Sequence, residues 1–285
     1  MTFTTRFAPS PTGPLHLGHA YSALLASDLA KAHGGQFLLR IEDIDQSRSR
    51  SQWEAQIYRD LEWLGLQWPK PVMRQSDRLP GYQTALDALW DRGLLYACTC
   101  KRRDIIAAST APQEGAEPVF GPDGPIYPGT CRDAQHPRDA GALRLDMRKA
   151  LSSLSDSALS FVEEGAGPKG ETGEILVRPN HLIDLVGDVV LARRDMGTSY
   201  HLSVVLDDAA QAVTHVVRGR DLFEATAIHA LLQALLGLPT PRYHHHRLIR
   251  DDAGKRLAKR DDARALSLYR ENGVTPMEIR NMLDL

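Results

Sequence analysis

RFAPSPTGPLHLGHAYSALLASDLAKAHGG, residues 6–35, places proline and glycine breakers ahead of two histidines and a helical pattern. Phe3 to Ala8 is typical of a strand, and the apolar spacing predicts a helix from about Leu17 to Ala32 that a glycine pair ends. Gln36–Ile41 follows as a second short strand. Strand, helix and strand in this order predict a βαβ unit with its turn at the carboxyl edge of a parallel sheet.

The rest of the chain extends this pattern on both sides of an irregular segment. Residues 96–178 are rich in proline, glycine and short polar runs, so we expect an insertion that is not part of the sheet. Outside it, strands and helices alternate, which predicts an α/β fold with a mainly parallel sheet. The further helices are expected at Trp53–Leu64, Tyr82–Leu95 and Glu224–Leu236, and the further strands at Leu202–Leu206 and Val213–Val217.

The composition is that of an ordinary globular protein. The chain has 285 residues, 42% hydrophobic and 25% charged, with a net charge of −2, which excludes a globally basic nucleic-acid coat. No apolar run approaches the roughly 20 residues that span a bilayer, and the N-terminus has no signal-peptide core. We therefore expect a cytoplasmic protein without membrane contact, and, in the absence of a coiled-coil pattern, a monomer.

Three cysteines lie in the irregular segment and predict a metal site. Cys98 and Cys100 form a C-x-C pair, and Cys131 follows later, so the cysteines cannot all pair as disulfides. A segment poor in apolar residues gains stability from a structural zinc, which needs a fourth ligand. Tyr127 and His136 are both available, and zinc chemistry alone favours the histidine. The consecutive histidines at 244–246 alternate sides along a strand and are expected to lie on its surface rather than to bind a metal.

The turn before the first helix admits two interpretations. A helix N-terminus offers backbone N–H groups and a partial positive charge, which suit phosphate. His16 and His19 are three residues apart, so both can face one anionic ligand. The alternative is an ordinary βα turn with two exposed histidines.

Three blocks of sequence favour the first interpretation. RFAPSPTGPLHLGHA with LRIEDIDQSR resembles the opening of the glutamyl-tRNA synthetase family, whose HIGH-type motif is here His16-Leu17-Gly18-His19. Ala8 and Ser10 match the glutamate-type form of this segment. SYHLSVVLDDAAQAVTHVVRGRDL (199–222) resembles the second half-sheet of the same family, and GKRLAKRD (254–261) stands where that family has its KMSKS loop. The resemblance implies a class I synthetase fold with a Rossmann-like parallel sheet, a small zinc-containing insertion and a short helical C-terminal region.

The resemblance also implies the site residues. The substrate carboxylate needs a guanidinium, which Arg218 or Arg6 can supply in bidentate fashion, and the substrate ammonium needs a carboxylate such as Glu42. The implied glutamate pocket consists of Arg6, Phe7, Ala8, Pro9, Ser10, Glu42, Tyr200 and Arg218.

Catalysis is implied for His16, His19 and Lys259, which would stabilise the triphosphate of ATP together with Mg²⁺. Gly18 and Arg256 complete the implied ATP site. The loop departs from KMSKS, because Arg256 replaces the first lysine and Ala258 replaces the serine.

The related short synthetases hold zinc through Cys, Cys, Tyr and Cys, which implies the set Cys98, Cys100, Tyr127 and Cys131. The implied domains are a first catalytic half with the HIGH motif (1–95), an acceptor-binding and zinc insertion (96–180), a second catalytic half (181–246), and a KMSKS-like loop with a short helical tail (247–285).

The chain stops about 25 residues after Lys259, where a full glutamyl-tRNA synthetase continues into an anticodon-binding domain. It therefore resembles the short paralogues of the family, the glutamyl-queuosine tRNA(Asp) synthetases. Such an enzyme activates L-glutamate with ATP without tRNA and transfers glutamate to queuosine at the wobble position of tRNA(Asp). The alternatives are a truncated synthetase that charges a tRNA 3′ end, a catalytically silent paralogue that binds tRNA or a protein, and a nucleotidyltransferase for a small metabolite.

Overall fold

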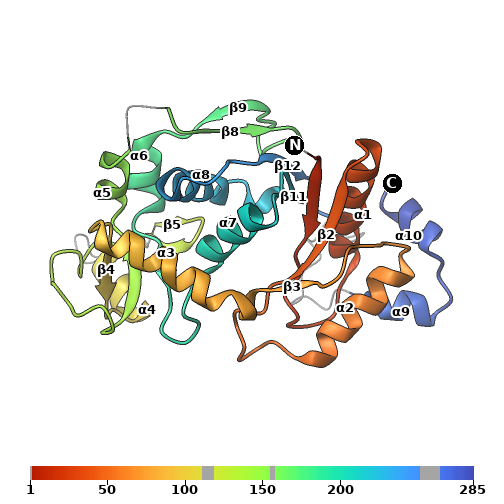
Figure 1. The fold of residues 1–285 in the computed structure, drawn as a ribbon, viewed down its shortest axis with the longest axis horizontal. Helices are drawn as coiled ribbons and strands as arrows, with labels where there is room; N and C mark the ends of the chain where they lie inside the picture. Colours follow the sequence, from red (N-terminus) through yellow and green to blue (C-terminus); the bar gives the residue numbers. More distant parts are fainter. Residues whose placement is uncertain (1, 111–118, 155–157, 251–263) are drawn as a thin grey trace.

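The computed structural model describes residues 2–110, 119–154, 158–250 and 264–285. Its first half contains the predicted βαβ unit. β1 (Thr4–Phe7) and β2 (Gln36–Ile41) are parallel, with Arg6 opposite Leu38, and α1 (Leu17–Ala32) connects them (Figure 1). The bounds of α1 and β2 agree with the sequence prediction. β3 (Met73–Arg74) adds a third parallel strand beside β2.

The second half continues the sheet on the other side of β1. β11 (His215–Gly219) lies beside β1, and the Thr214 N–H donates to the Thr4 carbonyl at 3.0 Å (Figure 1). β12 (Arg242–His246) is parallel to β11, and α8 (Ala225–Leu236) connects the two strands. The predicted strand at 213–217 and the predicted helix at 224–236 are thus confirmed. The α/β fold with its parallel sheet is confirmed as well.

Two predictions about the strands of the sheet are wrong. Leu202–Leu206 is not a strand but lies inside α7 (Tyr200–Ala210), which Ser199 caps through a 3.4 Å bond to the Leu202 N–H. The helix is buried on most of its circumference, so no period of apolar and polar residues identifies it, and two adjacent valines favour a strand.

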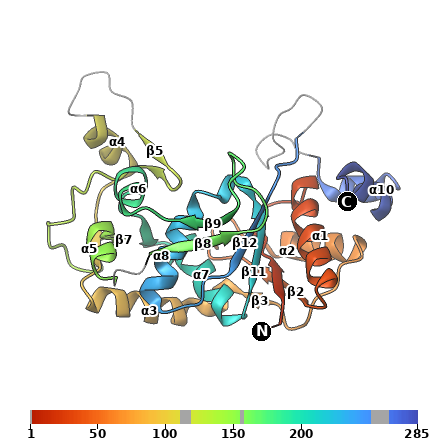
Figure 2. The ribbon, with the colours of Figure 1, turned by 90° about the horizontal axis from the view of Figure 1, so that it is seen from above.

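The insertion is not excluded from the sheet either. β8 (Ser160–Glu163) is parallel to β12, with Glu163 opposite Tyr243, and β9 (Gly173–Leu176) pairs antiparallel with β8. Figure 2 shows these two strands between α1 at one end of the molecule and the rest of the insertion at the other. These strands are short, and the prolines and glycines around them conceal them in the sequence.

The rest of the insertion and the residues on either side of it form small elements around an antiparallel sheet. β7 (Ala142–Leu145) is the middle strand, between β4 (Leu95–Cys98) and β10 (Val190–Ala192). β5 (Phe120–Gly121) and β6 (Gly124–Pro125) form a tight hairpin. The helices of this part are α4 (Arg102–Thr110), α5 (Met147–Ser152), α6 (Pro179–His181) and a π-helical turn at Leu182–Val186.

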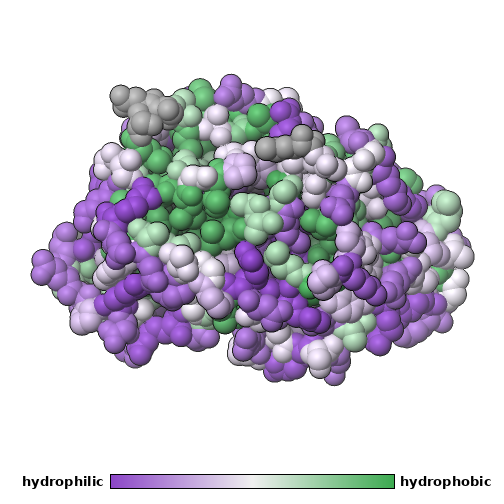
Figure 3. All heavy atoms as spheres, in the orientation of Figure 1, coloured by the Kyte–Doolittle hydropathy of each residue, from purple (hydrophilic) through white to green (hydrophobic). Residues whose placement is uncertain are grey.

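The remaining helices divide between two apolar cores. α2 (Ser51–Trp63) and α3 (Leu79–Asp91) overlap the predicted helices at 53–64 and 82–95, but α3 ends at Asp91 and Leu95 lies in β4. 3₁₀ turns lie at Gln75–Arg78 and Arg220–Leu222. α9 (Leu266–Glu271) and α10 (Pro276–Met282) form the C-terminal tail, and their buried side chains join the apolar core under α1. A second core lies among α3, α7, α8 and the central strands. In Figure 3 apolar surface gathers near the middle of the visible face, and hydrophilic side chains surround it.

Within the described ranges no helix combines the length and apolar character that a bilayer crossing requires.

Candidate active site

The turn before α1 fixes both histidines of the HIGH-type motif. His16 is the N-cap residue, and its Nδ1 accepts the Gly18 N–H at 3.1 Å. The Nδ1 of His19 accepts the His16 N–H at 3.1 Å, and the two ring centroids are 3.8 Å apart. A nitrogen that accepts a backbone N–H carries no proton, so each imidazole is neutral and has its proton on Nε2. The turn therefore contains two neutral imidazoles rather than two full charges.

Gly18 has a steric role in this turn, because a Cβ there would lie 3.0 Å from the Cε1 of His16. The end of the chain returns to the same place. The Leu266 N–H donates to the Leu15 carbonyl at 2.8 Å, and Ala265 forms a bridge with His16. Arg256 and Lys259 lie outside the described residues, but the described chain resumes next to His16.

A buried cluster of charges holds the carboxyl ends of β1 and β2. Arg6 binds Asp208 of α7 through Nε at 2.9 Å and Nη2 at 3.2 Å. Arg40 bridges Asp208, at 2.7 Å, and Glu42, at 3.1 Å. Burial raises the pKa of Glu42 against the attraction of Arg40 and Arg6. Burial also disfavours ionised Asp208, but the two arginines together lower its pKa.

This cluster changes the expectation for Arg6. Its side-on pair of donors is already bound to Asp208, so it does not offer that pair to a substrate carboxylate. The sequence interpretation missed Asp208 and Arg40. Asp208 was missed because its segment was assigned to a strand and connecting loop, and Arg40 because a strand arginine next to an acidic run gave no distinct signal.

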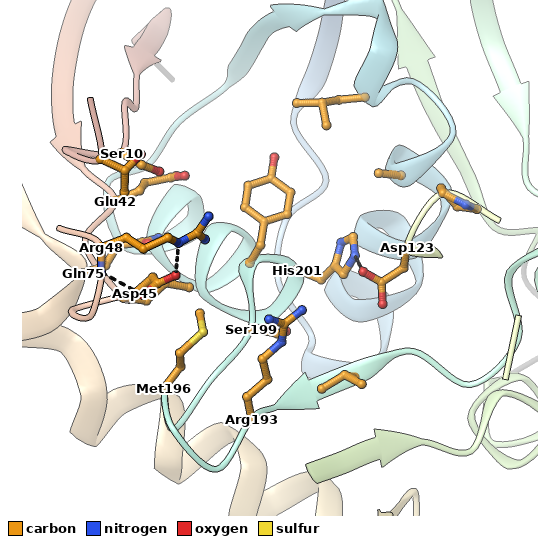
Figure 4. Close-up of a pocket in the computed structure, with 17 residues that line it drawn as sticks. Ser10, Glu42, Asp45, Arg48, Gln75, Asp123, Arg193, Met196, Ser199 and His201 are labelled. Carbon is orange, nitrogen blue, oxygen red and sulfur yellow. Dashed lines mark hydrogen bonds and ion pairs between the residues drawn. The ribbon is translucent and has the colours of Figure 1, made fainter. Parts of the chain in front are cut away.

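A cavity of about 310 Å³ opens between the two half-sheets. Ser10 and Glu42 line it from the first half, and His201 lines it from α7 (Figure 4). Tyr200 of α7 also belongs to the lining. Of the other predicted glutamate-pocket residues, none is in the lining, and Arg6 and Arg218 are buried behind it. Further lining side chains, which the sequence interpretation did not name, include Asp45, Arg48, Gln75, Asp123, Arg193 and Ser199.

Arg218 is a buried cation without a carboxylate partner in the described part of the chain. Its guanidinium donates to His245 Nε2 at 3.0 Å, His229 Nδ1 at 3.2 Å, the Leu222 carbonyl at 3.1 Å and Thr226 Oγ1 at 2.7 Å. All four acceptors are neutral groups. Arg218 is 6% exposed, and the ring of Tyr200 packs on His229 next to it, with centroids 5.6 Å apart. A buried guanidinium surrounded by neutral acceptors is suited to an anionic ligand.

The consecutive histidines form part of β12, as expected, but they are not all on the surface. His245 and His246 are buried, and each binds a different partner: His245 binds Glu163, and His246 binds Ser22 of α1. The interpretation as surface was wrong because β12 lies between β11 and β8.

The cysteines meet in a single cluster. The sulfur atoms of Cys98, Cys100 and Cys131 lie within 4.8 Å of one another, and those of Cys100 and Cys131 are 3.5 Å apart. Two thiolates on one tetrahedral zinc are about 3.8 Å apart, given Zn–S bonds of about 2.3 Å. The Tyr127 hydroxyl lies 3.5 Å from the Cys100 sulfur and accepts the Cys131 N–H at 2.8 Å. The three cysteines can thus bind a metal ion.

Comparisons with known proteins agree with this geometry. The family model for the catalytic domain of class I tRNA synthetases (E and Q) matches residues 2–118 and 171–285. A glutamyl-Q tRNA(Asp) synthetase of Rhodobacter capsulatus is 63% identical over 281 residues, which cover 99% of both chains. The enzyme of the same name from Deinococcus radiodurans is 44% identical and covers 97% of this chain and 86% of its own.

Solved structures show the same relationship. A glutamate tRNA ligase from Elizabethkingia meningosepticum, in complex with its amino acid, has a TM-score of 0.70 at 29% identity and covers 92% of this chain. The present chain spans about half of that ligase, 52% of its length. A methionyl-tRNA synthetase from Mycobacterium tuberculosis, at 11% identity and a TM-score of 0.59, shares the fold. The chain belongs to the class I glutamyl- and glutaminyl-tRNA synthetase family and, within it, to the glutamyl-Q tRNA(Asp) synthetases.

Proposed function

We propose that the chain activates L-glutamate with ATP, without tRNA, and transfers the glutamyl group to queuosine at the wobble position of tRNA(Asp). The observation that carries the proposal is Arg218, a buried cation behind the cavity whose acceptors among the described residues are all neutral. The side-chain carboxylate of glutamate supplies the missing negative charge. Glu42, which lines the same cavity, supplies the carboxylate for the substrate ammonium.

The activation step joins the α-carboxylate of glutamate to the α-phosphorus of ATP. A carboxylate oxygen attacks the α-phosphorus in line, the new P–O bond forms, and the bond to the departing pyrophosphate breaks. The neutral imidazoles of His16 and His19, at the N-terminus of α1, are proposed to stabilise the phosphate oxygens as charge develops on them. Lys259, with Arg256, is proposed to neutralise the pyrophosphate, and Mg²⁺ supplies further charge neutralisation when it is bound with ATP. In the second step the acceptor on queuosine attacks the glutamyl carbonyl, and AMP leaves.

We further propose that Cys98, Cys100, Cys131 and Tyr127 hold a structural zinc. A zinc oxygen ligand at about 2.1 Å would lie about 3.6 Å from a coordinated sulfur, and the Tyr127 hydroxyl is 3.5 Å from the sulfur of Cys100. Burial disfavours a thiolate at Cys131, but hydrogen bonds, that of Tyr127 first, lower its pKa to about 6. His136 contributes to the same lowering and acts as a neighbour of the cluster. The metal would fix residues 96–180, the proposed acceptor-binding insertion between the catalytic halves 1–95 and 181–246, with residues 247–285 as the ATP-contacting loop and tail.

ATP–pyrophosphate exchange in the presence of glutamate tests the activation step. The wild-type chain should catalyse exchange without tRNA. Arg218→Gln should raise the KM for glutamate about 100-fold, the equivalent of one charged hydrogen bond in a buried site. Arg242→Gln is the matched control, because this exposed guanidinium on neighbouring β12 pairs with Glu164 on the surface. No exchange by the wild type at any glutamate concentration would contradict the activity and favour a silent paralogue.

The acceptor needs a separate experiment. Labelled glutamate should be transferred to tRNA(Asp) that contains queuosine and not to the same tRNA without it. The label should stay on the anticodon loop fragment after nuclease cleavage. Label on the 3′-terminal fragment would instead identify a truncated synthetase that charges the tRNA end.

A further inference from the structure

Two chains of hydrogen bonds hold Arg218, and both begin at a carboxylate of the insertion. In the first, Glu163 Oε2 binds His245 Nδ1 at 2.5 Å, and His245 Nε2 binds Arg218 Nε at 3.0 Å. In the second, Asp123 binds His201 Nε2 at 3.3 Å, His201 Nδ1 binds His229 Nε2 at 3.1 Å, and His229 Nδ1 binds Arg218 Nη1 at 3.2 Å. Figure 4 shows the contact between His201 and Asp123 at the edge of the cavity.

The chemistry of arginine fixes the protons along the first chain. A guanidinium only donates, so His245 Nε2 accepts from Arg218 and carries no proton. The proton of His245 is therefore on Nδ1 and is donated to Glu163. Both oxygens of Glu163 accept hydrogen bonds. Oε2 accepts from His245 Nδ1, and Oε1 accepts the backbone N–H groups of Gly165 at 2.8 Å and His245 at 2.9 Å. Burial opposes its ionisation, but the bonds from His245 and Gly165 lower the pKa of Glu163, so it accepts as a carboxylate.

The same reasoning orders the second chain. His229 Nδ1 accepts from Arg218, so its Nε2 donates to His201, whose own Nε2–H is directed to Asp123. Leu222 and Thr226 take both N–H bonds of Arg218 Nη2. A guanidinium has five N–H bonds, and four of those of Arg218 have acceptors among the described residues. One N–H, on Nη1, is left for a ligand.

We propose that Glu163 is a positioning residue for substrate recognition: it fixes the tautomer of His245, which fixes Arg218 with one Nη1–H toward the glutamate carboxylate. The proposal rests on the proposed function for the identity of that ligand. The geometry of the strands favours it, because Arg218 and His245 are direct partners on the parallel strands β11 and β12, and β8 brings Glu163 to the other side of β12. The insertion thereby contributes to the amino-acid site.

Glu163→Gln separates this role from simple packing. The glutamine has nearly the same shape, and its amide oxygen can accept the two backbone N–H groups that Glu163 Oε1 now accepts. Its NH₂ group then faces His245 Nδ1, which must become an acceptor. The proton of His245 moves to Nε2, where it meets the N–H of Arg218, and two donors that face each other repel. The substitution therefore displaces Arg218 although no atom of the cavity lining changes.

The test compares Glu163→Gln with Glu164→Gln, a neighbouring carboxylate that pairs with Arg242 and His215 on the surface. In glutamate-dependent exchange, Glu163→Gln should raise the KM for glutamate at least about tenfold, the loss of one well-directed charged hydrogen bond. Its KM for ATP should stay within about twofold, and Glu164→Gln should match the wild type in both. Glu163→Asp, which keeps the carboxylate, should recover part of the affinity. An unchanged KM for glutamate in folded Glu163→Gln would overturn the proposal.

A measurement without activity completes the test. Nitrogen-15 NMR of histidine-labelled protein should show His245 protonated on Nδ1 in the wild type and on Nε2 in Glu163→Gln. Wild-type protein with the proton on Nε2 would refute the positioning role even if Glu163→Gln fails to fold. Absence of exchange by the wild type would refute the proposed function instead, and the wild-type tautomer would still decide the arrangement around Arg218.

Discussion

Acidification from pH 8 to pH 5 should weaken the fold through His246, the last residue of β12. The side chain is 7% exposed and connects two distant parts of the chain. Its Nδ1–H donates to the Arg247 carbonyl at 2.8 Å, and its Nε2 lies 2.6 Å from Ser22 Oγ of α1. Because the carbonyl can only accept, Nε2 has no proton and accepts from the serine. Burial lowers the pKa of His246 to about 4, although the hydrogen bond to the Arg247 carbonyl opposes this shift.

The sign and size of the effect follow from the difference between folded and unfolded pKa. The unfolded histidine titrates near pH 6.5, so below that pH the unfolded chain binds a proton that the folded chain refuses. Stability is unaffected above pH 7, falls as the pH drops through 6.5, and levels off below pH 4. One pKa unit corresponds to about 1.4 kcal/mol, which gives about 2 kcal/mol lost at pH 5 and about 3 kcal/mol below pH 4.

Urea unfolding at pH 8 and pH 5 measures this loss. His246→Asn retains an amide that can donate to the Arg247 carbonyl but has no titrating group. Between the two pH values, the wild-type protein should lose about 2 kcal/mol more unfolding free energy than the variant. The contributions of the buried His229 and His245 are the same in both proteins and cancel in this difference. His33→Asn, an exposed imidazole, should keep the wild-type dependence. An equal pH dependence for wild type and His246→Asn would refute the assignment.

Two further perturbations address the metal and the first βαβ unit. Cys131→Ser should abolish stoichiometric zinc in metal analysis of the purified protein. It should also lower the midpoint of thermal unfolding, because a structural zinc contributes folding free energy. Wild-type protein without zinc would contradict the proposed site. Gly35→Ala should lower the free energy of unfolding by at least about 2 kcal/mol in urea, because its Cβ would lie 2.0 Å from the Phe3 carbonyl oxygen. Gly81→Ala is the control: a Cβ at this position in α3 meets open space, so its free energy of unfolding should be equal or higher. Similar values for the two glycine variants would be inconsistent with the close approach at Phe3.

The sequence predicts the bounds of α1 and β2 to the residue, and those of β1, α2 and α3 to within a few residues, because its signals are local. Proline and glycine mark the ends of β1 and α1, and the helix between them is rich in alanine and leucine and has no β-branched residue. The same rules fail for α7, where both faces are buried between the two half-sheets. A helix that is buried all round loses the period on which its assignment depends.

In the candidate site, too, some residues could be predicted from the sequence and others could not. Ser10, Glu42 and Tyr200 reach the cavity as the family motifs imply, and the first turn brings His16 and His19 together. The partners that set their charge could not be predicted, because Arg6 and Asp208 are 202 residues apart and nothing in either segment identifies the other. The ionisation of a side chain depends on the charges that the fold brings next to it, whatever their distance in the sequence. For that reason the sequence motif alone gave Arg6 a substrate contact that Asp208 already occupies on its side-on edge.

Glu163 connects the insertion with the buried Arg218 through His245. A segment rich in proline and glycine is usually interpreted as an addition to a catalytic sheet, replaceable without effect on the amino-acid site. Here the insertion supplies both carboxylates, Asp123 and Glu163, that order the histidines around Arg218. Each carboxylate acts through neutral imidazoles, so the negative charge remains at least one ring away from the guanidinium and does not compete with a substrate carboxylate for it. A direct ion pair would hold Arg218 as firmly but would occupy the charge that recognition needs. The histidines thus hold Arg218 in place and leave it without a carboxylate partner among the described residues.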